Sequence, residues 1–221
     1  METLEALKHL LWPTRCASCD VLLSNPSMQV CESCMKGIIP VESCDVPEGL
    51  DGMMAIFEYV GPIGTMIGKW KYHEDYGAQK ALMSLIGSQI ERLGAYVPED
   101  VCLIPVPPHP KRLRERGFDP VWTFAAKLRR ILENGGINAT LGDDILIRTR
   151  HTKRQATLTE EERKHNLSGA FKVVQALPQA PIILVDDVIT TGATTVTCAQ
   201  TLRAAGAGWI GALSLAHPVK R

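Results

Sequence analysis

One segment, residues 181–206, constrains the fold of this chain more strongly than any other. Pro181 is followed by the apolar run Ile182-Ile183-Leu184-Val185, which is typical of a strand buried on both faces of a sheet. Asp186 and Asp187 come next, and a helix is predicted over residues 193–205, ended by Gly206. The segment therefore predicts a strand, a turn and a helix, with the turn at the edge where open α/β sheets bind ligands.

Strand and helix patterns alternate through the rest of the C-terminal region. Residues 54–60, 101–106 and 209–215 are expected to form strands, and residues 77–93 and 121–132 are expected to form helices. This alternation predicts an α/β fold in which helices flank a parallel sheet. A chain of 221 residues fits one domain of ordinary size with a small appendage.

The turn after the two acids has the chemistry of a phosphate site. The first turn of a helix presents unpaired backbone N–H groups to an anion, and glycine lets a ligand approach the backbone closely. Two carboxylates beside it suit ribose hydroxyls, or a magnesium ion held through water. The alternative is an ordinary strand-to-helix connection capped by threonine. The residues assigned to the phosphate are Val188, Ile189, Thr190, Thr191, Gly192, Ala193, Thr194 and Thr195.

Two basic stretches are expected near this turn. After residues 104–110, four of the next six residues are basic, and among them Arg112 and Arg116 are candidates for binding a diphosphate. A second stretch over residues 148–155 contains Arg150 and precedes a capping box at Thr159 and Glu162, an arrangement typical of a lid over an anionic substrate. The alternatives are a solvated basic helix start and a flexible surface loop.

The cysteines indicate a structural metal site. Cys16-Ala17-Ser18-Cys19 and Cys31-Glu32-Ser33-Cys34 are two Cys-x-x-Cys motifs, which together supply the four thiolates of a closed zinc site. Buried or redox-active cysteines are the alternative. Cys102 and Cys198 fall inside a predicted strand and a predicted helix, so core positions are expected for both.

Composition limits the remaining possibilities. Residues 2–11 are expected to form a short amphipathic helix, and residues 42–58 contain acids but no bases. We therefore expect an N-terminal helix and zinc module over residues 1–50, and a second domain over residues 51–221. The 24 basic and 24 acidic residues cancel, so net charge predicts neither a nucleic-acid nor a membrane partner. An acidic N-terminus and the lack of a long apolar run predict a cytoplasmic protein without membrane insertion.

The 185–195 segment resembles the signature of type I phosphoribosyltransferases. That resemblance implies that Asp186 and Asp187 hold the ribose hydroxyls in the catalytic site, that the turn binds the 5-phosphate, and that magnesium accompanies phosphoribosyl diphosphate. Thr190 stands where purine-salvage members usually have an aspartate, which counts against purine salvage.

The order of motifs along the chain resembles the ComF family, whose members have an N-terminal cysteine module and a phosphoribosyltransferase domain. The family pattern continues Arg-Gly-Phe-Asn-Gln, whereas Asp119 and Pro120 follow Phe118 here, so this chain lacks the two side-chain amides of that pattern. The matching segments are Lys71-Tyr72-His73, Pro105-Val106-Pro107, residues 112–118, Arg150 with Gln155, residues 163–171 and residues 185–195.

The ComF resemblance implies three hypotheses. The first is a phosphoribosyltransferase, a glycosyltransferase that moves a pentosyl group to a nitrogen nucleophile, with Lys71, Arg112, Arg116 and Arg150 binding the ligand. The second is an accessory of natural competence and transformation. It would act during DNA uptake on single-stranded DNA, together with competence proteins such as a helicase or a recombination mediator. The third is a sensor of phosphoribosyl diphosphate without turnover.

Overall fold

The computed structural model describes residues 13–149 and 169–218. The helix expected over residues 2–11, Arg150 and the capping box at Thr159 and Glu162 lie outside these residues. The helices are α2 (Glu32–Lys36), α3 (Gly61–His73), α4 (Tyr76–Gly87), α5 (Ile90–Tyr96), α6 (Pro110–Arg116), α7 (Pro120–Asn134) and α9 (Ala193–Ala204). The strands are β1 (Gly52–Glu58), β2 (Asp100–Pro105), β3 (Asn138–Leu141), β4 (Leu146–Arg148), β5 (Phe171–Val173), β6 (Ile182–Val188) and β7 (Ile210–His217).

The main sheet has five strands in the order β1-β7-β6-β2-β3, and every pair in it is parallel. After β2 the chain moves outward to β3 and then crosses back to β6 on the other side of β2. The carboxyl ends of β2 and β6 therefore meet where the strand order reverses, the place where open α/β sheets form a ligand crevice.

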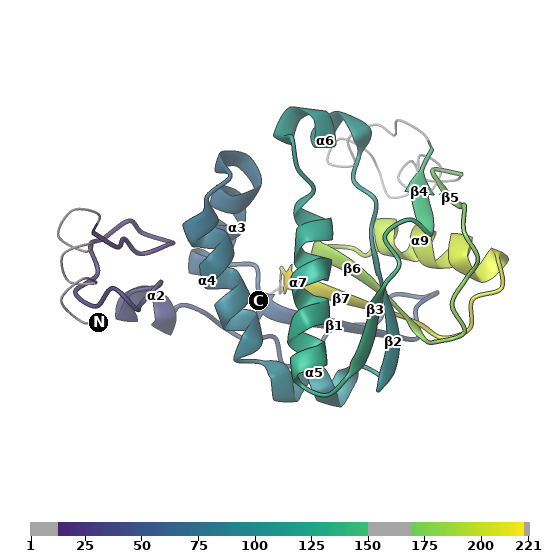
Figure 1. The fold of residues 1–221 in the computed structure, drawn as a ribbon, viewed down its shortest axis with the longest axis horizontal. Helices are drawn as coiled ribbons and strands as arrows, with labels where there is room; N and C mark the ends of the chain where they lie inside the picture. The colour runs from purple at the N-terminus through teal and green to yellow at the C-terminus, as the bar shows by residue number, and fades with distance from the viewer. Residues whose placement is uncertain (1–12, 150–168, 219–221) are drawn as a thin grey trace.

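Helices cover the two faces of this sheet unequally (Figure 1). Side chains of alternate strand residues enter two separate core clusters: Leu103 and Ile183 pack with α3, α4, α5 and α7, whereas Ile104 and Leu184 pack with α9. Period-two alternation with apolar residues on both faces is what a parallel sheet buried on both sides requires. The predicted α/β class, a parallel sheet flanked by helices, is confirmed.

The observed elements correct two helix predictions. The helix expected over residues 77–93 is two helices, because α4 ends at Gly87 and α5 begins at Ile90. Helix α3 was not predicted, although Ile63, Met66 and Ile67 form a buried stripe along it. The other strands and helices predicted within residues 13–149 and 169–218 are present with ends shifted by a few residues, and β3, β4 and β5 are additional short strands.

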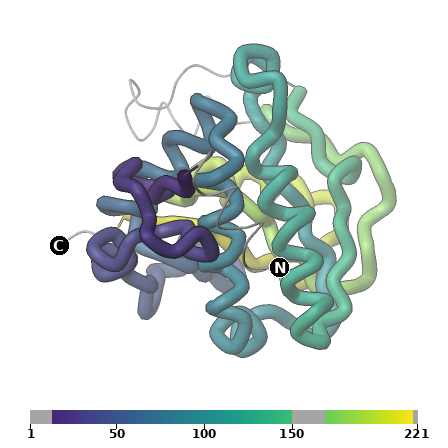
Figure 2. Tube along the Cα trace, turned by 60° about the vertical axis from the view of Figure 1, so that its left-hand side comes forward, coloured from purple at the N-terminus to yellow at the C-terminus, as the bar shows by residue number. Residues whose placement is uncertain are grey.

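The cysteine-bearing segment lies beside α3 and α4 at one end of the molecule (Figures 1 and 2). Cys16, Leu23 and Val30 belong to the same buried cluster as the residues of α3. On the surface, the Lys69 ammonium of α3 contacts the Asp20 carboxylate at 2.7 Å. The cysteine segment therefore shares its apolar core with the helices that cover one face of the sheet.

Candidate functional site

A pocket of about 430 Å³ opens beside the carboxyl ends of β2 and β6. Strand β6 runs to Val188, so Asp186 and Asp187 lie on its last residues rather than after it. The opposite wall comes from the loop after β2, from α6 and from the start of α7. The lining residues are Lys71, Val106, Pro107, Pro108, His109, Lys111, Arg112, Glu115, Arg116, Asp119, Pro120, Val121, Arg148, Asp186, Asp187 and Thr194.

An ion pair and a short hydrogen bond organise the acids of the pocket. The Lys71 Nζ atom lies 2.7 Å from Asp187 Oδ1, and the two side chains are 14% and 11% exposed. Asp186 Oδ1 accepts a hydrogen bond from the backbone N–H of Asp187 at 2.8 Å. Lys71 comes from the last turn of α3, so this helix supplies the cation that balances Asp187.

Burial and the neighbouring Asp187 charge raise the pKa of Asp186 to about 8, although Lys71 acts in the opposite direction. Two adjacent carboxylates on one strand cannot both ionise freely in a poorly solvated site. The pKa of Asp186 therefore lies above its ordinary value, and a cation or a ligand hydroxyl in the pocket would favour its ionised form. Perturbed carboxyls of this kind are concentrated at functional sites.

The basic wall of the pocket is built by α6. His109 caps this helix by accepting the Lys111 N–H through Nδ1 at 3.1 Å, and Gly117 ends it with φ of 75°. Arg112 and Arg116, one turn apart, both line the pocket. The Arg116 guanidinium lies 4.8 Å from the centre of the Tyr72 ring, a cation–π distance that joins α6 to the end of α3.

Sequence reasoning did not assign Asp119 and Arg148 to the site, although both line the pocket. Asp119 caps α7, since its Oδ1 accepts the N–H groups of Val121 and Trp122 at 2.9 and 3.1 Å, and Pro120 occupies the first turn. The Asp-Pro pair that departs from the ComF pattern thus forms a favourable helix start. Arg148 reaches the pocket from β4 and stacks on Phe171 at 5.2 Å. The Asp-Pro pattern at residues 119–120 predicts the start of a helix, but it does not indicate that Asp119 faces the pocket.

The predicted phosphate turn is formed as a tight connection between β6 and α9. Gly192 has φ of 74°, a left-handed conformation that favours glycine, and it precedes the first residue of α9. Thr194 lines the pocket, Thr190 and Thr191 are exposed, and Thr195 is buried. Of the predicted ligand residues, the pocket brings together Asp186, Asp187, Lys71, Arg112, Arg116 and Thr194. The other turn residues do not line it.

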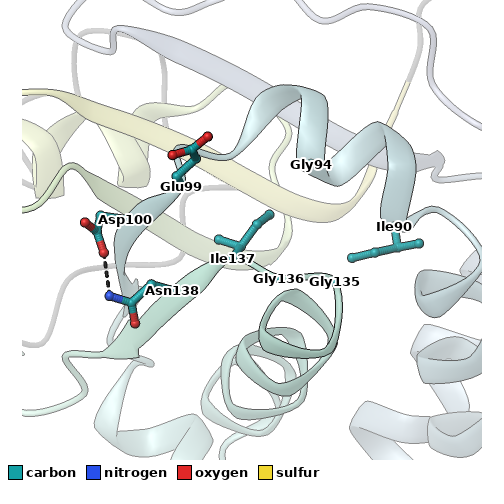
Figure 3. A pocket seen from close by; sticks show the side chains of 8 residues that line it. All are labelled: Ile90, Gly94, Glu99, Asp100, Gly135, Gly136, Ile137 and Asn138. Carbon is teal, nitrogen blue, oxygen red and sulfur yellow. Dashed lines mark hydrogen bonds between the residues drawn. The ribbon is translucent and has the colours of Figure 1, made fainter.

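A second hollow lies at the opposite edge of the sheet (Figure 3). It is formed around the starts of β2 and β3, where Asn138 Nδ2 donates a hydrogen bond to Asp100 Oδ1. Gly135 packs closely on Ile90 there, since a Cβ atom at residue 135 would meet Ile90 Cδ1 at 2.7 Å. This hollow faces the amino ends of the strands, away from the acids and arginines described above.

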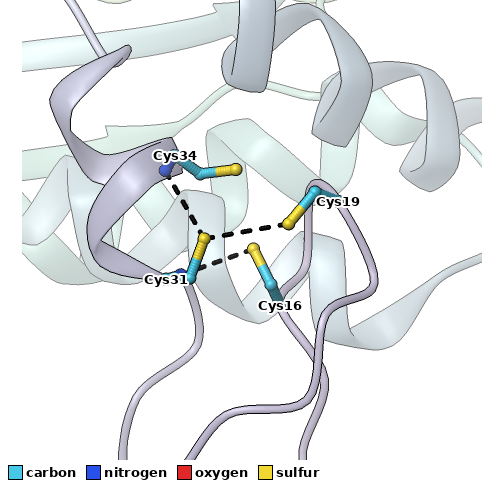
Figure 4. A group of neighbouring side chains, drawn as sticks. All are labelled: Cys16, Cys19, Cys31 and Cys34. Carbon is cyan, nitrogen blue, oxygen red and sulfur yellow. Dashed lines mark hydrogen bonds between the residues drawn. The ribbon is translucent and has the colours of Figure 1, made fainter.

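The four cysteines of the two Cys-x-x-Cys motifs converge (Figure 4). The Sγ atoms of Cys16, Cys19, Cys31 and Cys34 all lie within 4.8 Å of one another, and the Cys19 and Cys31 sulfurs are 3.7 Å apart. A regular zinc tetrahedron with bonds of about 2.3 Å places its sulfurs about 3.8 Å apart. The cluster could therefore hold a metal such as zinc.

Ionisation of the thiols supports this interpretation. Burial acts to raise the pKa of Cys16, but backbone N–H groups from Cys19, Cys31 and Ser18 lower it to about 6. Burial and the neighbouring thiols raise the pKa of Cys34 to about 12, although Ser18 acts to lower it. A divalent cation would offset the mutual repulsion that keeps the fourth thiol protonated. Cys102 and Cys198 are buried in the core, as predicted.

Within the described residues, no helix is both long enough and apolar enough to cross a membrane.

Comparisons with known proteins identify relatives by sequence. Over 163 residues the chain is 29% identical to competence protein F of Haemophilus influenzae, covering 71% of this chain and 68% of that protein. It is 27% identical over 162 residues to DNA utilization protein YhgH of Shigella flexneri, covering 72% and 68%. Competence protein ComFC of Streptococcus pneumoniae is 24% identical over 205 residues, covering 90% and 86%. No family model matches the chain. The predicted resemblance to ComF proteins is confirmed by these relatives.

A comparison with solved structures finds two phosphoribosyltransferases. Hypoxanthine phosphoribosyltransferase of Staphylococcus aureus has a TM-score of 0.37 and 9% identity, covering 60% of this chain and 61% of that chain. Hypoxanthine phosphoribosyl transferase of Trypanosoma cruzi has a TM-score of 0.34 and 13% identity, covering 64% and 66%. This chain thus matches less than two thirds of either enzyme, and TM-scores this low do not establish a common fold.

Proposed function

We propose that this chain, whose relatives are named competence protein F, ComFC and YhgH, binds phosphoribosyl diphosphate with magnesium and transfers its phosphoribosyl group. The observation that carries the proposal is the pocket at the strand-order reversal, with Asp186 and Asp187 on one wall and Arg112 and Arg116 on the other. The acids suit a ribose and the guanidinium groups suit a diphosphate.

The components of the ligand match distinct parts of this pocket. The two carboxylates would accept hydrogen bonds from the ribose 2- and 3-hydroxyls, and the start of α9 with Thr194 would receive the 5-phosphate. Magnesium would arrive on the diphosphate oxygens and contact the acids through water. Arg112 and Arg116 would stabilise the departing diphosphate as positive charge develops at C1. Arg150, which lies outside the described residues, is proposed as a further cation that binds the ligand.

The four-cysteine cluster is proposed to hold zinc as a structural ion. Four thiolates leave no open coordination position for substrate, so the metal would stabilise the segment and take no part in group transfer. The proposed units are residues 1–50 and residues 51–221. Cys16, Leu23 and Val30 of the first unit share a buried apolar cluster with α3 and α4 of the second.

Calorimetric titration of the zinc-loaded protein with phosphoribosyl diphosphate and magnesium tests the ligand site. The Asp186→Asn/Asp187→Asn variant is expected to lose more than about tenfold in affinity, because it loses charge-assisted hydrogen bonds to the ribose. The matched control is Asp143→Asn/Asp144→Asn, a second adjacent pair of acids, both exposed and outside the pocket. Wild-type protein that is folded and zinc-loaded but binds no ligand would refute the proposal.

A second candidate function is suited to the names of the relatives, which refer to competence and DNA utilization. The exposed cations of α6 would bind the backbone of single-stranded DNA, with a competence helicase or recombination mediator as partner. Arg112 lines the pocket, whereas Arg114 is exposed and lies outside it. This difference separates a small anionic ligand from a polymer that contacts the whole surface of α6.

Fluorescence anisotropy with a labelled oligothymidine tests this candidate. If DNA binds along α6, Arg112→Ala and Arg114→Ala weaken binding alike, and each lowers the salt dependence by about 0.7 in the slope of log K against log salt. If only the small ligand binds, Arg112→Ala weakens its calorimetric affinity and Arg114→Ala does not. Oligothymidine that fails to bind at low salt would exclude direct DNA binding.

A further inference from the structure

Asp119 is the acidic residue that the proposed binding of ribose and diphosphate leaves without a role. It stands between α6 and α7 and lines the same pocket as Asp186 and Asp187, on the wall that carries Arg116. A carboxylate on a wall otherwise suited to an anion calls for a separate chemical explanation, because it opposes binding of the diphosphate.

The lone pairs of Asp119 are divided between structure and pocket. Its Oδ1 atom accepts both capping hydrogen bonds, from the N–H groups of Val121 and Trp122. Within the described part of the chain, Oδ2 accepts no hydrogen bond. Because the cap fixes the carboxyl plane through Oδ1, Oδ2 is the oxygen left to contact a ligand in the pocket.

The other carboxylates of the pocket are already engaged. Glu115 pairs with Lys111 at 3.7 Å and its side chain is 58% exposed. Asp187 pairs with Lys71, and Asp186 accepts the N–H of Asp187. Glu115 and Asp187 are each paired with a lysine, and Asp186 and Asp187 are assigned to the ribose hydroxyls. None of the three is therefore available to accept a proton from a nucleophile.

His109 does not supply a base either. Its Nδ1 accepts the Lys111 N–H, so the proton of a neutral ring resides on Nε2, and this nitrogen donates rather than accepts. The threonine hydroxyls near the ligand do not take up a proton at neutral pH.

We propose that Asp119 is the general base that accepts the proton of the nitrogen nucleophile, an inference that rests on the proposed function. The nucleophile is an N–H-bearing amine or azole. Its nitrogen forms a bond to C1 of the ribose while the C1–O bond to diphosphate breaks, and the electron pair of that bond leaves with the diphosphate. The proton of the nucleophile passes to Asp119 Oδ2 and from there to water.

The surroundings of Asp119 strengthen it as a base. Burial and the charge of Asp187 raise its pKa, against the lowering effect of the capping N–H groups and of Arg116. A base is most effective when its pKa lies near the working pH. The charged and titratable groups that share the pocket with it are His109, which caps α6, Lys111, Arg112, Glu115 and Arg116 of α6, Asp186 and Asp187 of β6, Lys71 of α3 and Arg148 of β4.

The test compares Asp119→Asn with Asp75→Asn in the full zinc-loaded chain. Asparagine caps helices as well as aspartate does, so Asp119→Asn removes the base and keeps the cap. Asp75 provides the matched control, since it caps α4 by accepting the Ala78 N–H and does not line the pocket. Calorimetry measures binding of phosphoribosyl diphosphate with magnesium, and diphosphate release is then measured with hydroxylamine as the probe nucleophile.

We expect Asp119→Asn to bind phosphoribosyl diphosphate at least as tightly as wild type, because it removes a negative charge from the pocket, but to release diphosphate about 100-fold more slowly. At a fixed concentration of unprotonated hydroxylamine, the wild-type rate at saturating phosphoribosyl diphosphate falls as pH decreases through the pKa of Asp119, and this acid limb is absent in the variant. Asp75→Asn behaves as wild type. A merely structural role would leave the rate and the acid limb of Asp119→Asn unchanged.

Three results would overturn the assignment: an Asp119→Asn rate equal to wild type, a rate that falls only in proportion to lost affinity, or no diphosphate release from a wild-type protein saturated with ligand. Failure of the proposed function is recognised separately, because calorimetry then finds no binding before hydroxylamine is added.

Discussion

The Lys71 ammonium lies 2.7 Å from the Asp187 carboxylate, and this ion pair links the last turn of α3 to the end of β6. The pair couples a helix of one face of the sheet to the proposed ribose site. A ligand hydroxyl that bonds to Asp187 has to share it with Lys71. The lysine is therefore placed to respond to ligand and to hold the acid in position before ligand arrives.

Lys71→Met is expected to lower the free energy of unfolding at pH 7 by about 1–3 kcal/mol, because it leaves Asp187 without its cation in a nearly buried position. Urea unfolding measures the loss. Lys69→Met is the control from the same helix: its partner Asp20 is 65% exposed, so the expected loss is less than about 1 kcal/mol. Equal losses in the two variants would contradict a special role for the Lys71 pair.

Stability should depend on pH through Asp186. Burial, followed by the charge of Asp187, raises its folded pKa from 3.8 to about 8, so the folded state holds a proton that the unfolded state releases between these values. The contribution of Asp186 to stability therefore decreases as pH rises through this window and levels off above it. The quantity to compare is the free energy of unfolding of Asp186→Asn minus that of wild type. This difference should be at least about 1 kcal/mol more favourable to the variant at pH 8 than at pH 4.

Urea unfolding of wild type and Asp186→Asn at both pH values measures this difference. Asp143→Asn is the control, since Asp143 is exposed and outside the pocket. A stability difference between wild type and Asp186→Asn that does not change with pH would show that Asp186 ionises freely in the folded protein.

The cysteine cluster makes a prediction for metal content. Cys19→Ser should lose about one zinc ion per chain as measured by elemental analysis, because three thiolates bind zinc far more weakly than four. Cys44→Ser should retain the metal, since Cys44 does not belong to the cluster. Cys16 and Val30 share a core with α3, so metal loss should also lower the unfolding temperature. Full zinc occupancy in Cys19→Ser would exclude a four-cysteine site.

The strand, turn and helix around the two acids were predictable because each local signal agrees with the fold. The apolar run of β6 is typical of a buried strand, and the predicted helix end at Gly206 matches an α9 that ends at Ala204. The two Cys-x-x-Cys motifs were equally informative, since their spacing fixes where the thiols go. In both regions chemistry and local structure come from the same few consecutive residues.

Helix α3 escaped prediction because its propensity contradicts its packing. Gly61, Pro62, Gly64 and Gly68 are poor helix formers, whereas Trp70 and the apolar stripe are buried against the sheet, and tertiary packing decides the outcome. Without α3, the contact between Lys71 and Asp187 could not be predicted either.

Asp119 was missed for a different reason: its importance depends on a wall formed by two helices, and no local pattern indicates which surface an N-cap faces.

The contact between Pro47 and Gly192 yields the last prediction. Gly192 has φ of +74°, and a Cβ atom there would meet Pro47 Cγ at 2.7 Å. Gly192→Ala should therefore cost the strain of a left-handed alanine, about 1–3 kcal/mol, plus the clash with a rigid proline ring. Gly206→Ala isolates the strain, because Gly206 has φ of +101° and a Cβ atom at that residue would meet no other atom within 4 Å.

A double-mutant comparison separates the two costs in urea unfolding. In the Pro47→Ala background the clash is absent, so Gly192→Ala should there lower the free energy of unfolding only by the strain of the left-handed alanine. This loss should be close to the loss that Gly206→Ala causes in the wild-type protein. If the turn binds the 5-phosphate, Gly192→Ala should also weaken calorimetric binding of phosphoribosyl diphosphate, and the double variant should regain part of it. If the free energy of unfolding and the ligand affinity recover together, the contact with Pro47 determines the conformation in which the turn binds phosphate. Recovery of stability alone would mean that Pro47 only packs against it.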